Sequence, residues 1–172
     1  MSILDLAGAN QSTVSFITGL GHRIYSDDIL LQLDRSFGEG DFYENQNDPV
    51  AMEKFLATAL DFSTELFDGA LAWDVLGYLS GSLLNAVVGR LHAVLRPGAN
   101  LLAVFHADER AQTVPAYSYR IHDRSTVEIS SRGPRRPAQF FTNRHLERLF
   151  QNFQSMKFFL TRDGLREVIV RR

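Results

Sequence analysis

Short apolar runs alternate along this chain with longer segments in which apolar residues recur at helical spacing, and this alternation restricts the fold most strongly. The runs at 67–73 (FDGALAW) and 99–106 (ANLLAVFH) are apolar almost throughout, which is typical of strands buried in a parallel sheet. Between them, the leucines and valines at 84–95 recur at every third or fourth position, which predicts a helix that the RPG at 96–98 ends. This order predicts an α/β fold, a sheet covered by helices.

The start of the chain follows the order strand, tight turn, helix and strand. A turn of small residues lets the backbone approach a ligand closely, and the free N–H groups of a helix start favour anionic groups. The expected elements are a strand at 2–6, the turn Ala7-Gly8-Ala9, a helix at 10–20 capped by Asn10 or Ser12, and a strand at 23–26 that ends on Asp27 and Asp28. Such an order is typical of a nucleotide-binding site.

The remaining segments complete a chain whose length suits one domain, which we expect to span 1–172. We expect a polar loop at 36–48, a helix at 50–60, an extended excursion or a hairpin at 117–131, a loop at 132–137, a helix capped by Thr142 or Asn143, and strands at 156–161 and 165–170. The Asp-Gly pair between the last two strands predicts that they form an antiparallel hairpin.

Composition excludes several kinds of site. The absence of cysteine excludes disulfides, thiolate zinc sites and cysteine nucleophiles. The five histidines show no metal-ligand spacing, so we expect no metal. No apolar run approaches the roughly 20 residues that cross a bilayer, and the first residues lack the basic region of a signal peptide. We therefore expect a cytoplasmic protein that does not bind membranes.

Charge is distributed unevenly along the chain. Residues 1–131 hold 8 Lys and Arg against 17 Asp and Glu, whereas residues 132–172 hold 10 against 3. A basic final segment has two interpretations: a surface for an anionic partner such as nucleic acid, or solvated arginines on the outer faces of one helix and two strands. We favour solvated arginines, because no nucleic-acid recognition motif lies among them.

Four segments in order resemble the class I S-adenosylmethionine-dependent methyltransferases, particularly those that act on small molecules. ILDLAGAN resembles the glycine-rich first motif, and RIYSDDIL the second strand with its terminal acid. FDGALAWDVLGYL resembles the fourth strand and its turn, and RLHAVLRPGANLLAVFH the helix and fifth strand that follow. The likeness runs from Ile3 to about His106, and the final hairpin adds to it. It implies a doubly wound, mostly parallel Rossmann-like sheet with a C-terminal antiparallel strand pair.

The resemblance implies S-adenosylmethionine as the cofactor and assigns a role to each part of the site. Asp27 or Asp28 would accept hydrogen bonds from the ribose, and the other would cap the next helix. The remaining roles are Asp5 at the amino-acid end, Ala7, Gly8 and Ala9 as backbone contacts, Asp61 and Phe62 at the adenine edge, and Trp73 and Asp74 beside the reacting methyl group. Trp73 can equally well be an ordinary core aromatic at the end of a strand.

His106 and Asp74 are the candidate catalytic residues. His106 ends the fifth strand of the family pattern beside Asp108 and Glu109, where it could act as a general base or simply be a polar strand terminus. Tyr117 and Tyr119 lie where the family often places substrate-contacting insertions, so we expect them to contact a small-molecule acceptor.

The sequence also departs from the family pattern, which leaves other functions open. Alanines stand at 7 and 9 where the family has glycines, and no third strand is evident. The helix that usually precedes the first strand is either missing or belongs to sequence outside the given residues. The main alternative is a non-catalytic, methyltransferase-like binding or scaffold protein. A dinucleotide-dependent enzyme lacks its GxGxxG motif here, and a nucleic-acid methyltransferase rests only on the basic segment. The sequence does not determine the oligomeric state or the acceptor.

Overall fold

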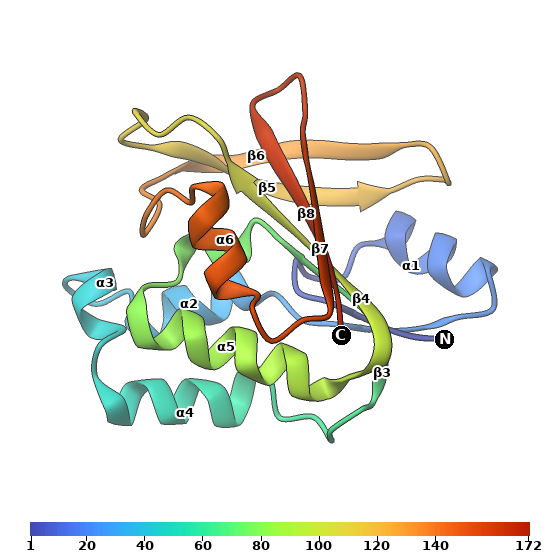
Figure 1. The fold of residues 1–172 in the computed structure, drawn as a ribbon, viewed down its shortest axis with the longest axis horizontal. Coiled ribbons are helices and arrows are strands. Elements are labelled where there is room, and N and C mark those ends of the chain that lie inside the picture. Colours follow the sequence, from blue (N-terminus) through green and yellow to red (C-terminus); the bar gives the residue numbers. More distant parts are fainter.

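A six-stranded sheet forms the centre of the computed structural model, which describes residues 1–172 (Figure 1). Its strand order is β2-β1-β3-β4-β8-β7. The strands are β1 (Ser2–Asp5), β2 (Arg23–Ser26), β3 (Phe67–Trp73), β4 (Leu95–His106), β7 (Ser155–Leu160) and β8 (Leu165–Arg171). Strands β1 to β4 are parallel, whereas β8 pairs antiparallel with both β4 and β7. The mostly parallel sheet with a C-terminal antiparallel pair is confirmed.

Two further strands, β5 (Val114–Ile121) and β6 (Val127–Arg135), pair only with each other. This resolves the open choice for the segment after β4, which is a hairpin. The loop expected at 132–137 was wrong, because β6 continues to Arg135 by pairing with Val114 of β5. Composition favoured a loop there, but both strands of a two-stranded sheet are edge strands, where proline is tolerated.

The helices are α1 (Gln11–Gly19), α2 (Ile29–Phe37), α3 (Phe42–Asn45), α4 (Pro49–Ala59), α5 (Gly81–Val94), α6 (Asn143–Leu149) and the 3₁₀ helix η1 (Val75–Tyr78). Asn10 caps α1 and Thr142 caps α6 through their side chains. The polar segment at 36–48 is not a plain loop, because Asp41 accepts hydrogen bonds from the N–H groups of Tyr43 and Glu44 and so begins α3. None of the helices is long and apolar enough to span a membrane.

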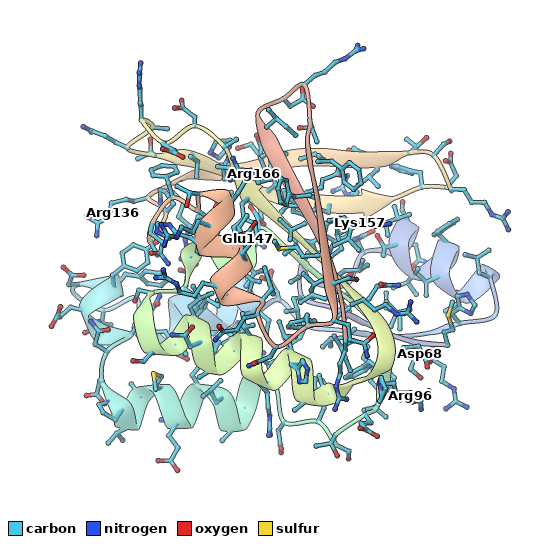
Figure 2. The ribbon with its side chains drawn as sticks, viewed as in Figure 1. Asp68, Arg96, Arg136, Glu147, Lys157 and Arg166 are labelled. Atoms are coloured by element: carbon cyan, nitrogen blue, oxygen red, sulfur yellow. The ribbon has the colours of Figure 1, made fainter.

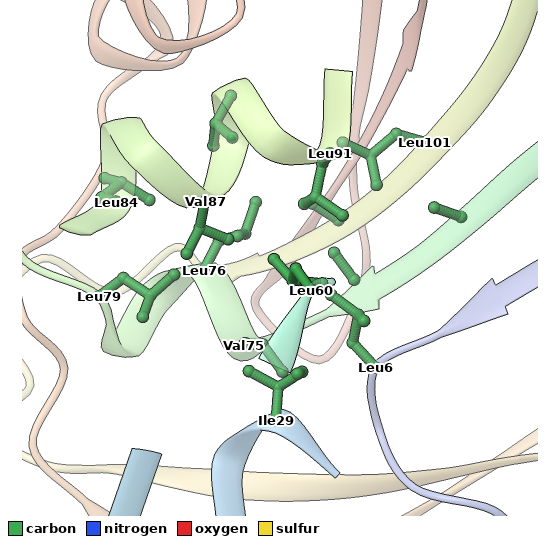
Figure 3. Packing of buried hydrophobic residues seen from close by; sticks show 14 of the residues in the cluster. Leu6, Ile29, Leu60, Val75, Leu76, Leu79, Leu84, Val87, Leu91 and Leu101 are labelled. Carbon is green, nitrogen blue, oxygen red and sulfur yellow. The ribbon is translucent and has the colours of Figure 1, made fainter. Parts of the chain in front are cut away.

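Helices α2, α4, α5 and α6 all contribute residues to the main core, and Figure 3 shows Ile29 of α2 and several residues of α5 within it. Leu84, Val87 and Leu91 of α5 project toward the sheet at the helical spacing that the sequence predicts. Helix α1 contributes no residue to this cluster. A second, small cluster of Trp73, Val104, Tyr119 and Leu165 joins the sheet to β5.

One feature of the sheet differs from the expectation, and another agrees with it. Strand β4 begins at Leu95, so the RPG segment at 96–98 lies within a strand and is not a separate turn. Between β2 and β3 the chain forms only helices and loops, so the family's third strand is absent. The sheet therefore ends at β2 on this side.

An ion pair fixes the amino-terminal edge of the sheet. Asp68 of β3 accepts hydrogen bonds from Arg96 of β4 at 2.6 Å and from the Ser2 N–H of β1 at 2.6 Å (Figure 2). Both hydrogen bonds lower the pKa of Asp68, and the one from Ser2 has the larger effect. This edge lies opposite the carboxyl ends of the strands, where the predicted site residues are found.

Buried Gln46 replaces a conventional cap at the start of α5. Ser80 is the N-cap residue but makes no side-chain capping bond. Instead, the Gln46 side chain accepts hydrogen bonds from the Ser80 N–H at 2.8 Å and hydroxyl at 3.1 Å, and donates to the Tyr78 carbonyl at 3.1 Å. One side chain therefore joins the α3–α4 segment to the start of α5.

We predict that Gln46→Leu lowers the free energy of unfolding by about 1–3 kcal/mol, because it leaves buried polar groups without partners. Urea unfolding followed by circular dichroism measures this loss. Gln154→Leu, at an exposed position, is the control and should change stability little. Equal losses in the two variants would contradict the capping role of Gln46.

Candidate functional site

Most of the predicted site residues lie at the carboxyl ends of four adjacent parallel strands. They are Asp5, Ala7, Gly8 and Ala9 after β1, Asp27 and Asp28 after β2, Trp73 and Asp74 at the end of β3, and His106 at the end of β4. In open α/β sheets, ligands bind at this edge, beside the first strand.

Asp61 and Phe62 do not join this group. The Asp61 side chain is 76% exposed and pairs with Arg90 at 3.7 Å. Phe62 packs edge-to-face against Phe67, at the opposite end of β3 from Trp73. The segment is held there because no third strand carries it to the other edge of the sheet.

Backbone hydrogen bonds hold the turns after β1 and β2 together. The Gly8 N–H donates to the Asp27 carbonyl at 3.1 Å, and the Ile29 N–H donates to the Leu6 carbonyl at 3.2 Å. Gly8 has a φ of +88°, and a Cβ at this position would lie 3.2 Å from that of Asp28. Glycine is therefore required at position 8 by the turn itself.

The two carboxylates after β2 already have partners. Asp28 caps α2 by accepting from the Leu31 N–H, and it receives both terminal nitrogens of Arg132, at 3.2 and 2.9 Å. Asp27 accepts a 2.5 Å hydrogen bond from the Gln32 side chain. Of the two acids between which the sequence could not choose, Asp28 is the helix cap.

Asp5 is 1% exposed and accepts hydrogen bonds from the Trp73 indole N–H at 2.8 Å and the Ala7 N–H at 3.1 Å. Burial raises the pKa of Asp5, and the hydrogen bonds from Ala7 and Trp73 oppose this shift. Trp73 itself has a φ of +52°, which is a strained conformation for a bulky side chain. The indole hydrogen bond and the burial of the ring together maintain it.

The β5–β6 hairpin covers this edge of the sheet. The Tyr119 ring of β5 stacks on Trp73, with ring centres 4.3 Å apart and planes 11° apart. The Asn10 side chain donates to the Tyr119 carbonyl at 3.0 Å, and the Ile121 N–H donates to the Thr13 hydroxyl at 3.0 Å. Strand β5 therefore covers the start of helix α1 as well as the face of the Trp73 ring.

With the hairpin in this position, the part of the crevice between Trp73 and the start of α1 is covered. Trp73 and Tyr119 are both at least 96% buried, and each of the two acids after β2 is engaged by another side chain. The residue types suit a nucleotide, but the protein's own hairpin lies over the Trp73 ring.

Asp74 and His106 line one small cavity with a volume of about 10 Å³. Asp74 accepts from the Tyr117 N–H at 3.0 Å and the Tyr78 hydroxyl at 3.4 Å, and burial raises the pKa of Asp74 to about 6. Burial lowers the pKa of His106, and its Nε2 atom is buried without a hydrogen-bond partner. A neutral imidazole with a free ring nitrogen can accept a proton.

Several arginines of the basic final segment pair with acids from the front half of the chain. The pairs are Arg132 with Asp28, Arg135 with Asp34 and Arg172 with Glu65. Our interpretation of these arginines as solvated side chains was therefore wrong for these three. The fold places an acidic side chain from the front half of the chain next to each of them. No cluster of three or more His, Asp or Glu side chains is arranged to hold a metal ion.

Sequence reasoning missed Arg132 and Thr13 as residues of this edge. The charge imbalance between the two parts of the chain was the available signal for Arg132. No local pattern points to Thr13, because its hydroxyl accepts a hydrogen bond from the Ile121 N–H, which lies 108 residues away in sequence.

Comparison with known proteins finds solved structures of similar fold. The 1,6-didemethyltoxoflavin-N1-methyltransferase of Burkholderia thailandensis, solved with 1,6-didemethyltoxoflavin and S-adenosylhomocysteine, is 16% identical, with 99% of this chain and 70% of that chain covered and a TM-score of 0.53. An S-adenosylmethionine-dependent methyltransferase of Methanosarcina mazei is 17% identical, with 99% and 92% covered and a TM-score of 0.53. The glycopeptide N-methyltransferase MtfA with bound S-adenosylmethionine is 14% identical, with 98% and 86% covered and a TM-score of 0.51. No protein-family model and no curated protein sequence matches this chain.

Proposed function

Because this chain has the fold of class I S-adenosylmethionine-dependent methyltransferases, we propose that it binds S-adenosylmethionine and methylates a small molecule. One observation carries the proposal: the acid after β1, the small-residue turn and the acids after β2 converge at the sheet edge where ligands of such folds bind. The similar structures with bound S-adenosylmethionine or S-adenosylhomocysteine support this choice of cofactor.

In this proposal, Asp27 accepts from the ribose hydroxyls, since a carboxylate can accept from both members of a diol, and Asp28 caps α2. Asp5 and the turn from Ala7 to Ala9 contact the amino-acid end of the cofactor. Trp73 and Asp74 lie beside the acceptor, and His106 is the base for an acceptor that must lose a proton. The cofactor supplies an electrophilic methyl group, so the protein contributes mainly proximity and orientation.

The small-molecule acceptor rests on the similar enzymes, of which one was solved with the heterocycle 1,6-didemethyltoxoflavin. Tyr117 and Tyr119 are the proposed acceptor contacts on the hairpin. The cytoplasmic location expected from the sequence stays a prediction.

One observation favours the second candidate, a non-catalytic scaffold with this fold. The hairpin makes specific contacts with Trp73, which the proposal places beside the acceptor, with Asn10 and Thr13 at the start of α1, and with Asp28. A protein that had lost its cofactor could retain such contacts for stability.

Calorimetric titration with S-adenosylmethionine and S-adenosylhomocysteine separates the two candidates. We predict saturable binding that Asp27→Asn weakens at least about 10-fold, because hydrogen bonds to a charged group contribute roughly 1.5–3 kcal/mol each. Asp34→Asn is the control, since Asp34 also pairs with the hairpin but lies on α2 beyond the crevice. Absence of binding by both the wild type and a variant with a loosened hairpin would favour the scaffold. Transfer of label from [methyl-³H]S-adenosylmethionine into the low-molecular-mass fraction of a cell extract then tests for a small acceptor.

A further inference from the structure

We propose that the β5–β6 hairpin is an autoinhibitory strap that competes with the cofactor for the crevice, so that ligand binding requires its distal half to leave Trp73. The ligand's identity rests on the proposed function, whereas the movement of the hairpin does not. The residues of the crevice suit a nucleotide, whereas the hairpin covers Trp73 and the start of α1.

The hairpin can move without disrupting the main sheet, because neither of its strands pairs with the six-stranded sheet. Its base is anchored: Val114 and Ala116 belong to the main core, and Arg135 pairs with Asp34. Its distal half, which carries Tyr119 and Ile121, contacts Trp73, helix α1, and Val104 and Leu165 of β4 and β8. The anchored base therefore suits a hinge for the distal half.

Few contacts hold the distal half down. They are the stack of Tyr119 on Trp73, with Val104 and Leu165 in the same cluster, and the hydrogen bonds of β5 with Asn10 and Thr13. At the boundary with the base, the Tyr117 N–H donates to Asp74, and Arg132, which lies opposite Ala116 and Tyr117, pairs with Asp28. The ion pair is the contact most easily weakened alone, since both side chains remain about 30% exposed.

Closure also leaves a polar atom unsatisfied. The Tyr119 hydroxyl is buried with no hydrogen-bond partner. Buried polar atoms without partners destabilise the state that contains them. Opening returns the Tyr119 hydroxyl to water, where it can form hydrogen bonds. This lowers the free-energy difference between the closed and the open state, so the open state is accessible.

A closed crevice weakens the apparent affinity for a ligand in proportion to the open fraction. A change that raises the open fraction without touching the ligand therefore tightens binding by the same factor. Arg132→Gln is such a change, because it removes the ion pair with Asp28 and leaves the Trp73–Tyr119 contact intact. We expect the open fraction to rise about 3–10-fold, the range for a partly exposed, two-pronged ion pair.

Trp73 reports this opening directly, because it is the single tryptophan of the chain and is 4% exposed when the hairpin is closed. The experiment measures acrylamide quenching of its fluorescence, and then calorimetric binding of S-adenosylmethionine, in the wild type and two variants. Arg132→Gln should increase quenching without ligand and tighten binding about 3–10-fold. The matched control is Arg120→Gln, which breaks an ion pair with Glu128 inside the hairpin and should change neither quantity.

The outcomes separate this inference from the proposed function. Quenching in Arg132→Gln equal to that of the wild type would overturn the strap, whatever the ligand does. Increased quenching together with no binding by any variant supports a movable hairpin and rejects S-adenosylmethionine as the ligand. Binding that is equally tight in all three proteins would overturn the competition between hairpin and cofactor. Far-UV circular dichroism confirms that each variant remains folded.

Discussion

Replacing Trp73 with alanine should lower the free energy of unfolding by about 3–5 kcal/mol, the range for deleting a large buried aromatic. The Trp73 ring is buried between the sheet and Tyr119, and its indole N–H is one of the two donors to the buried Asp5 carboxyl. Alanine therefore removes the packing and also leaves Asp5 with only the Ala7 N–H. Denaturant unfolding followed by circular dichroism measures the effect.

Trp73→Phe separates these two contributions. Phenylalanine keeps a ring against Tyr119 but cannot donate to Asp5, so it should cost about 1–3 kcal/mol, the penalty for a buried acceptor that loses its donor. Exposed Phe159 of β7 provides the control, because Phe159→Ala removes a ring that is 53% exposed. A loss below about 1 kcal/mol in Trp73→Ala would show that this ring does not join the sheet to the hairpin.

Asp74→Asn should raise the stability at pH 7 by about 2–3 kcal/mol and leave it unchanged below pH 4. Burial raises the pKa of Asp74 from its ordinary value to about 6, so the folded protein binds this proton more tightly than the unfolded chain. The resulting stabilisation is complete below the unfolded pKa of about 4 and is lost as pH rises through about 6. Asparagine imitates the protonated acid, and its side-chain oxygen can still accept from the Tyr117 N–H.

The measurement is the difference in unfolding free energy between Asp74→Asn and the wild type from pH 4 to pH 8. This difference should grow as pH rises between 4 and 6 and then level off. Asp5, whose pKa burial also raises, contributes with the same sign but is present in both proteins, so it cancels. Phe159→Ala, which removes an exposed side chain that does not ionise, is the control and should change stability by the same amount at every pH. A difference that does not vary with pH would contradict the proton affinity of Asp74.

Much of the fold follows from local patterns in the sequence. Strand β3 was predicted at 67–73 and has these bounds, because a strand buried on both faces must be apolar throughout. The Asp-Gly pair fixed the final hairpin, and the spacing of leucines and valines fixed α5. These signals are carried by neighbouring residues, so no tertiary information is needed to detect them.

The edge that carries the candidate site could also be predicted, because parallel strands bring their carboxyl ends to one side of a sheet. Asp5, Asp27 and Trp73 meet there for that reason. Asp61 and Phe62 do not, because their assignment depended on a third strand that the chain does not form.

The sequence by itself determined the order of elements, the strand pair at the end and the residues at the carboxyl edge of the sheet. Only the tertiary structure decided that the crevice is closed. The contacts that close it join residues far apart in sequence, 104 positions for Asp28 and Arg132 and 109 for Asn10 and Tyr119. A weakly alternating strand such as β5 has the same local pattern whether it faces solvent or a neighbouring element. Its place over Trp73 is therefore fixed by packing and charge between distant segments, for which the sequence carries no periodic signal.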